Sequence, residues 1–208
     1  MRIYDITPPI TPQLGVWPGD TPACREVLLE ISRGATVTLS TLRATVHLGA
    51  HADAPSHYAE VAPAIEQRSL DYYLGPCQVV RVGAERGTRV TTSQMNATIA
   101  APRVLIDTGS FPDPDNWNND FAALDPNLVD DLHRRGVRLI GLDSPSVDLM
   151  ESKDLPAHKR FLANDMAILE GLVLRDVPVG VYELIALPLP LVGFDASPVR
   201  AILRASSG

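Results

Sequence analysis

The sequence contains few residues of the kinds that mark secreted or membrane-spanning proteins. It has only two cysteines in 208 residues, Cys24 and Cys77, and neither lies in a C-x-x-C or other ligand spacing. We therefore expect two buried thiols, without a disulfide bond or a cysteine metal site. No stretch of about 18 apolar residues occurs, and the N-terminus lacks the apolar segment of a signal peptide. These absences predict a cytoplasmic protein.

Basic residues are too few and too scattered to form a nucleic-acid-binding surface. The chain has 18 lysines and arginines against 25 aspartates and glutamates, which gives a net charge of −7 at pH 7. Nucleic acids and anionic membranes bind basic faces, so neither is expected as the main partner. The G-x-S-x-G pattern of a serine hydrolase nucleophile is also absent. A small molecule is therefore the expected partner.

What the sequence does contain is the pattern of one α/β domain. Apolar residues make up 45% of the chain and charged residues 21%, as in ordinary globular proteins. Prolines at positions 8, 9, 12, 18 and 22 predict a loop. Alternating or β-branched runs predict strands within 3–6, 36–46, 78–82, 103–106, 137–142, 181–187 and 199–203. We expect a single domain that spans residues 1–208.

Helical patterns alternate with these strands. The clearest runs from Pro126 to Arg135, with Asp125 as its N-cap and Gly136 beyond its end. A short helix is expected over 69–74, and a further helix is predicted from 164 or 165 through 170, closed by Gly171. The alternation of helices and strands indicates an α/β fold.

A cluster of histidines carries the chemistry of this sequence. Three of the five histidines, His47, His51 and His57, lie within eleven residues, together with Asp53. Imidazole and carboxylate groups are the ligands that divalent transition metals prefer. An extended chain would place the first and last of these histidines roughly 33 Å apart, which no shared metal site allows. The chain must therefore bend sharply here, and Gly49 suits such a bend.

Further metal ligands must come from downstream residues. His158 and Glu170 are candidates, but twelve positions apart on one helix they could not reach the same ion. We therefore expect His158 on a loop that leads into the helix ending at Glu170. By residue type alone, a plain solvated side chain is the favoured interpretation of each. His133 lies among basic residues at the end of its predicted helix, which explains it without a metal.

The run from His47 to His57 matches the pattern H-x-G-[TA]-H-x-D-x-P-x-H in full. It resembles the signature of the metal-dependent cyclase and formamidase family. The likeness extends to Trp17 and to the segments 143–148 (Asp-Ser-Pro-Ser-Val-Asp), 155–158 (Leu-Pro-Ala-His), 168–171 (Ile-Leu-Glu-Gly) and 182–188. Together these segments are similar to the bacterial kynurenine formamidase branch. The resemblance implies a compact single domain with a central barrel-like β-sheet flanked by helices, of the swivelling β/β/α type, and a homodimer.

The resemblance also implies a set of site residues. Two Zn²⁺ per chain, with Mn²⁺ as an alternative, would be bound by His47, His51, Asp53, His158 and Glu170. Within this set, Asp53 and Glu170 would bridge the two ions. His57 would stay free of metal and transfer protons, and Trp17 would line the substrate pocket. Ala50 replaces a threonine that is common in the wider family, but neither side chain is a ligand.

The implied reaction is the hydrolysis of N-formyl-L-kynurenine to L-kynurenine and formate, a step of tryptophan degradation, by a hydroxide held between two zinc ions. One alternative is a related cyclic-amide hydrolase that opens a ring such as that of isatin. Another is a catalytically silent metal-binding protein, although a retained His57 that is not needed for coordination favours an enzyme. If Trp17 is exposed and isolated, it could equally be a residue that anchors a protein–protein interface.

Overall fold

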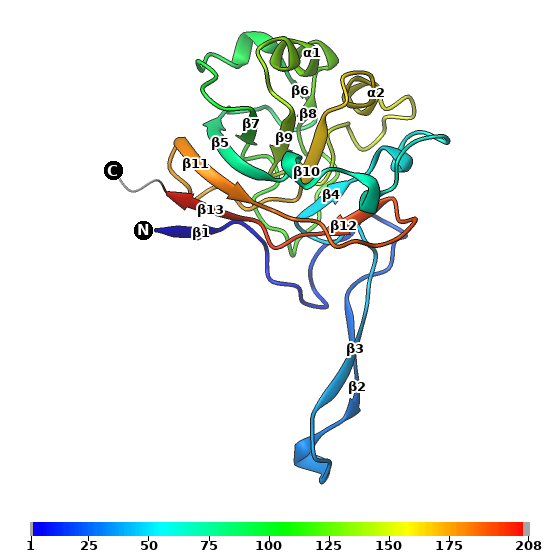
Figure 1. Cartoon of the computed structure of the whole chain (residues 1–208). Helices are drawn as coiled ribbons and strands as arrows, with labels where there is room; N and C mark the ends of the chain where they lie inside the picture. The colour runs from blue at the N-terminus through cyan, green and yellow to red at the C-terminus, as the bar shows by residue number, and fades with distance from the viewer. Residues whose placement is uncertain (1, 206–208) are drawn as a thin grey trace.

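Nine strands form one strongly curved sheet in the computed structural model, which describes residues 2–205 (Figure 1). In order across the sheet they are β1 (Ile3–Asp5), β13 (Ile202–Ala205), β11 (Gly180–Ile185), β5 (Leu74–Arg81), β7 (Arg103–Asp107), β9 (Leu139–Leu142), β10 (Ala167–Glu170), β4 (His51–Asp53) and β12 (Ala196–Pro198). The central strands β5, β7, β9 and β10 run parallel, and their outer neighbours pair antiparallel. Since β1 pairs with β13, both ends of the described chain belong to the same sheet.

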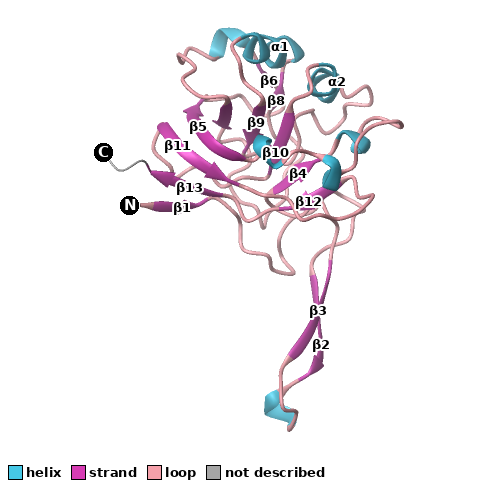
Figure 2. Cartoon of the chain, viewed as in Figure 1, coloured by secondary structure: helices cyan, strands magenta, loops and turns pink. Residues whose placement is uncertain are grey.

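Helices are few, and the two α-helices lie next to each other on one side of the sheet (Figure 2). The α-helices are α1 (Pro126–Arg134) and α2 (Pro156–Ala163), and the short 3₁₀ helices are η1 (Ile31–Arg33), η2 (Pro55–His57), η3 (Ile65–Gln67), η4 (Leu70–Tyr72) and η5 (Thr92–Gln94). Asp125 caps α1 by accepting a hydrogen bond from the Asn127 amide at 2.8 Å, as its sequence predicts. A short parallel pair, β6 (Arg89–Val90) and β8 (Ala123–Leu124), completes this layer. No helix among residues 2–205 has both the length and the apolar character needed to cross a membrane.

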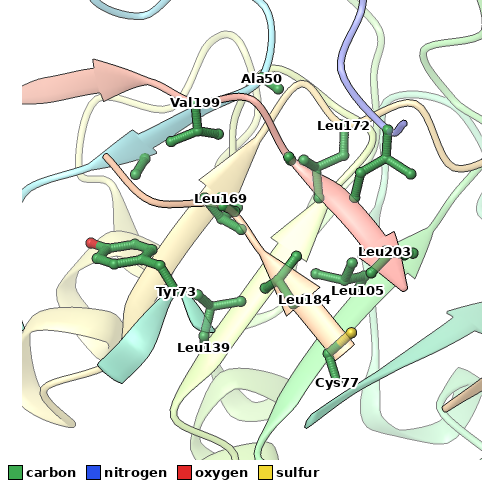
Figure 3. Packing of buried hydrophobic residues seen from close by; sticks show 14 of the residues in the cluster. Ala50, Tyr73, Cys77, Leu105, Leu139, Leu169, Leu172, Leu184, Val199 and Leu203 are labelled. Carbon is green, nitrogen blue, oxygen red and sulfur yellow. The ribbon is translucent and has the colours of Figure 1, made fainter. Parts of the chain in front are cut away.

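Two hydrophobic clusters cover the two faces of the sheet. Alternate residues of one strand enter different clusters, as Leu105 and Ile106 do on β7, because successive side chains of a strand point to opposite faces. The cluster inside the curve of the sheet includes Leu139, Leu169 and Leu184 (Figure 3). The other cluster packs against α1 and α2. The predicted fold class, a compact α/β domain with a barrel-like central sheet and flanking helices, is therefore confirmed.

The helix expected over 164–170 is wrong. Residues 167–170 form the strand β10, and all four are buried. The apparent capping residues have other roles, because Asn164 ends α2 and Asp165 adopts a left-handed backbone conformation with φ of 47°. A strand buried on both faces is a continuous apolar run, which cannot be told from a buried helix by periodicity alone. The short helix expected over 69–74 is a single 3₁₀ turn, η4.

A hairpin arm of β2 (Cys24–Leu29) and β3 (Leu39–Arg43) projects away from the rest of the molecule (Figure 1). Every residue of both strands is exposed. Cys24 lies on this arm, so the expectation of two buried thiols is wrong for it, whereas Cys77 is buried on β5. Both cysteines are free in this structure.

Candidate metal centre

Strand pairing places the first candidate ligands together. His51 and Asp53 are two residues apart on β4, so their side chains lie on the same face of the sheet. β4 pairs antiparallel with β10, and Glu170 lies directly opposite His51. Directly opposed residues of an antiparallel pair share a face and are close neighbours. The sheet therefore brings together two parts of the sequence that are more than a hundred positions apart.

The motif bends as its sequence predicts. Gly49 adopts a positive φ of 55° before β4 begins, and η2 turns the chain again after it. Gly171, with φ of 66°, lies so close to Gly49 that an added Cβ would be 2.2 Å from the Gly49 carbonyl oxygen. Only glycine permits this approach. The bend places His47 and His57 side by side, with ring centroids 4.3 Å apart.

All five ligands implied by the family resemblance converge on one point of the fold. Asp53 Oδ1 lies 3.1 Å from His47 Nδ1 and 3.4 Å from His51 Nε2. Its other oxygen, Oδ2, lies 3.5 Å from His158 Nε2. Glu170 spans the same positions, with Oε2 3.3 Å from His51 Nε2 and Oε1 4.0 Å from His158 Nε2. The two carboxylates therefore lie between one group of nitrogens, from His47 and His51, and a second nitrogen from His158.

Each of the three histidines uses its other ring nitrogen to contact a hydrogen-bond acceptor. His51 Nδ1 lies 2.9 Å from the Gly49 carbonyl oxygen, His158 Nδ1 lies 2.9 Å from Asp148 Oδ2, and His47 Nε2 lies 3.0 Å from an oxygen of Asp195. Carbonyl and carboxylate oxygens only accept, so these three nitrogens carry the hydrogen. In a neutral ring the opposite nitrogen then presents a lone pair, and all three lone pairs point toward Asp53. Such outer partners fix the orientation of metal-binding histidines.

The buried polar atoms of this cluster fit a bound cation. His51 Nε2 and both oxygens of Asp53 are buried without a hydrogen-bond partner among the described residues, which is costly unless something else satisfies them. Burial would lower the pKa of His51, but Asp53 and Glu170 raise it to about 10. Burial would raise the pKa of Asp53, but the histidines around it hold that pKa well below its usual range. The centre therefore attracts positive charge, and a metal ion competes with protons for such groups.

His158 lies in the first turn of α2, and not on the loop predicted for it. The residue before this helix has no capping side chain, and Asp148, from the loop between β9 and α2, supplies the cap. It accepts hydrogen bonds from the amides of Ala157 and His158, both at 3.1 Å, and from Arg89 Nη1 at 2.8 Å. Burial would raise the pKa of Asp148, but the hydrogen bonds from His158 and Arg89 lower it. One carboxylate thus starts the helix and orients the histidine that faces Asp53.

A cavity of about 470 Å³ opens onto this cluster. His57 and Trp17, the two other predicted site residues, both line it. Trp17 is not isolated, because its ring packs edge-on against Trp117 with centroids 5.6 Å apart. Phe111 lines the same wall, and none of the lining residues is lysine or arginine. The pocket therefore combines aromatic walls with a floor of histidines and carboxylates.

Sequence reasoning missed several residues of this site. Asp148 lay within a segment that resembles the family, but it carried no predicted role. Trp117 and Phe111 come from a loop without any motif, which the fold brings beside the proline-rich loop through a hydrogen bond from the Gly15 amide to the Pro114 carbonyl at 2.8 Å. Asp195 had no sequence signal at all. These residues act through tertiary contacts, which spacing along the chain does not reveal.

Comparison with known families agrees with this geometry. Residues 4–149 match the model of the Cyclase family, whose description is "Putative cyclase". The chain belongs to the Cyclase family. The matched region includes the whole histidine motif and the loop that ends at Asp148, whereas His158 and Glu170 lie beyond it.

Solved structures share the Cyclase-family fold over almost the whole chain. A "potential metal-dependent hydrolase with cyclase activity" is 28% identical, with a TM-score of 0.84 over 97% of this chain and 96% of that one. A "predicted metal-dependent hydrolase" from Bacillus stearothermophilus is also 28% identical, with a TM-score of 0.80 over 97% of each chain. An isatin hydrolase bound to the product analogue thioisatinate is 18% identical, with a TM-score of 0.85 over 99% of this chain and 92% of that one. At that identity the last likeness concerns the fold alone.

Proposed function

We propose that this Cyclase-family protein is a metal-dependent amide hydrolase that converts N-formyl-L-kynurenine and water to L-kynurenine and formate. The observation that carries the proposal is the convergence of three histidine lone pairs and two buried carboxylates on the floor of an aromatic-walled cavity. Similarity to two structures described as metal-dependent hydrolases supports the hydrolytic class. The resemblance of the sequence motifs to kynurenine formamidases supports the choice of substrate.

The proposed cofactor is two zinc ions per chain, with manganese as the alternative. Support comes from the way Asp53 and Glu170 each direct one oxygen toward His51 and the other toward His158. His47 and His51 would complete one position and His158 the other. When bound, such ions supply Lewis-acid polarisation of the formyl oxygen and lower the pKa of water toward about 7.

His57 is the proposed proton-transfer residue. Its side chain lines the cavity and is 36% exposed, in contrast to the nearly buried rings of His51 and His158. Hydrolysis adds hydroxide to the formyl carbon and breaks the C–N bond, so the aniline nitrogen must receive a proton. A histidine beside the reacting amide is suited to deliver it. Trp17 and Trp117 would contact the aryl ring of the substrate.

Opening of a cyclic aryl amide is the second candidate reaction. The shared fold with an isatin hydrolase favours it, because the bond broken is also an amide bond to an aniline nitrogen. Steady-state kinetics on N-formylkynurenine, formanilide and isatin, with metal content measured on the same sample, separate the candidates. A higher kcat/KM for isatin would overturn the kynurenine assignment. No turnover of any amide by zinc-loaded protein would instead support a metal-binding protein without catalysis.

A homodimer in the cytoplasm is part of the proposal. The hairpin arm exposes large apolar side chains on both strands, including Leu28 at 50% and Leu42 at 64%. An isolated two-stranded hairpin is marginally stable in water, and exposed apolar clusters mark interfaces. We therefore propose that the arm packs against a second copy of the chain. Light scattering of the wild type should give twice the chain mass. Leu42→Asp should give the monomer mass with zinc still bound. A monomeric wild type would refute this arrangement.

A further inference from the structure

Asp195 lies between two histidines of the motif, although it is far from them in the sequence. It directly precedes β12, whose first residue pairs with Asp53 on β4. The Ala54 amide donates a hydrogen bond to the Asp195 carbonyl oxygen at 2.8 Å. The backbone of Asp195 is therefore held beside the motif by the edge of the main sheet, while its side chain is 45% exposed.

One oxygen of this carboxylate contacts both neighbouring imidazoles. Asp195 Oδ2 lies 3.0 Å from His47 Nε2 and 3.2 Å from His57 Nδ1. A carboxylate oxygen only accepts hydrogen bonds, so both of these nitrogens carry the hydrogen. In the neutral rings, His47 Nδ1 is then free to face Asp53 Oδ1, and His57 Nε2 is free to accept a proton. A single oxygen thus selects the tautomers of two rings with different tasks.

We propose that Asp195 is a positioning residue that holds His57 in the tautomer needed for proton transfer and holds His47 in the tautomer needed for metal binding. The part about proton transfer rests on the proposed function. The part about tautomers does not, because it follows from the two contacts alone. Carboxylates that accept from the outer nitrogen of a metal-binding histidine typically contribute about 10–100-fold in metal affinity or activity.

The same three residues also satisfy a different arrangement. Ligand atoms of His47, His57 and Asp195 all lie within 4.8 Å of one another, which is close enough for a shared ion. In that arrangement Asp195 would be a ligand, and its removal would abolish one metal position. Positioning instead predicts an unchanged metal count at saturating zinc. Metal counting therefore distinguishes the two arrangements.

The kinetic test compares Asp195→Asn with Glu66→Gln. Glu66 lies on η3 and accepts a hydrogen bond at 3.1 Å from the amide of Gly193, which is on the loop that leads to Asp195. It is therefore a carboxylate that bonds to the same loop, and among the described residues it bonds to neither histidine. With formanilide at saturating zinc, Asp195→Asn should lower kcat by about 10–100-fold and change KM by less than about twofold. Glu66→Gln should match the wild type. Equal losses in the two variants would overturn the proposal, because they would indicate disturbance of the loop.

A double-mutant cycle shows whether Asp195 acts through His57. In a His57→Ala background, Asp195→Asn should cause almost no further loss of kcat, since the group that it positions is gone. If the fold-losses of kcat from the two substitutions instead multiply in full in the double variant, Asp195 does not act through His57 and the proposal is overturned. The cycle is measured at saturating zinc, so that any weaker metal binding through His47 does not contribute.

Two measurements need no substrate, so their results stand even if the protein hydrolyses none of the tested amides. Nitrogen-15 NMR of labelled imidazoles, assigned by comparison with His57→Ala, should show His57 protonated at Nδ1 in the zinc-loaded wild type and shifted toward the other tautomer in Asp195→Asn. Chelator competition should show about tenfold weaker zinc binding with an unchanged number of bound ions. An unchanged NMR spectrum, or the loss of one ion per chain, would overturn the proposal.

Discussion

Replacing Asp148 by asparagine should destabilise the fold and weaken the part of the metal centre that contains His158. The buried carboxylate accepts from Arg89 Nη1 at 2.8 Å, from the His158 amide at 3.1 Å and from His158 Nδ1 at 2.9 Å. Asparagine has the same size but keeps only one acceptor oxygen. Its amide group would present N–H hydrogens to groups that also donate.

The size of the effect follows from these contacts. A hydrogen bond to a charged group contributes about 1.5–3 kcal/mol, and loss of a helix cap costs about 1 kcal/mol. Arg89 keeps a second acceptor, the Leu124 carbonyl at 2.7 Å, so its charge is not left without a partner. We therefore expect the free energy of unfolding to fall by about 3 kcal/mol, which lowers Tm by roughly 6–12 °C for a domain of this size.

Thermal and urea unfolding followed by circular dichroism measure this change, with and without zinc. Chelator competition should also show zinc binding weakened by about 10–100-fold. Asp130→Asn is the matched control, because Asp130 contacts Asn164 at 2.8 Å and Arg160 at 3.3 Å near the same helix but lies away from the metal centre. It should cost less than about 1 kcal/mol. A Tm within about 2 °C of the wild type for Asp148→Asn, or equal losses in both variants, would contradict the role assigned to Asp148.

Three further predictions concern the surroundings of the site. Burial raises the pKa of Asp143 to about 6, so this carboxyl group ionises at a lower pH in the unfolded chain than in the folded protein. Its ionisation should therefore lower the free energy of unfolding of the wild type by roughly 3 kcal/mol between about pH 4 and pH 6. Urea titrations of Asp143→Asn should lack this component, and a pH profile identical to that of the wild type would contradict the prediction. Gly171→Ala should prevent tight zinc binding or folding, because the added Cβ would lie 2.2 Å from a backbone atom. The control Gly136→Ala, at a similar φ but with open space around it, should lower the free energy of unfolding by only about 1 kcal/mol. Zinc titration and Tm measure both variants, and a small effect of Gly171→Ala would show that the two loops can separate. Trp17→Ala should raise KM and leave kcat largely unchanged, because stacking acts on the ground state and the transition state alike. An unchanged KM in folded, zinc-loaded protein would remove Trp17 from the substrate pocket.

The pocket also makes a prediction about substrate range. Its lining includes no lysine or arginine to pair with the α-carboxylate of N-formylkynurenine. Removing the amino-acid portion of the substrate should therefore cost little binding energy within this chain, and formanilide should have a KM within about tenfold of that for N-formylkynurenine. A KM for formanilide that is far higher than that for N-formylkynurenine, measured by formate release, would indicate that a carboxylate-binding group comes from elsewhere, such as the partner subunit.

Local sequence was sufficient for the features that depend on near neighbours. The helix α1 follows from its own N-cap, its first-position proline and the glycine beyond its end, all within twelve positions. The bend of the histidine motif follows from ligand chemistry together with chain geometry, because donors spread over eleven residues cannot meet one ion in an extended chain. Gly49 and Pro55 favour that bend through their own backbone preferences, which need no distant partner.

Tertiary structure decided everything that depends on partners far away in the sequence. The run 167–170 could be a helix or a strand by its own pattern, and it became β10 because β9 and β4 pair with it on either side. His158 faces the centre because the fold brings its Nε2 to 3.5 Å from Asp53 Oδ2, a residue more than a hundred positions away. Asp195 reaches two histidines only because β12 joins the edge of the sheet. Hydrogen bonds and burial act through space, so a sequence can carry the groups that make them without showing which groups will meet.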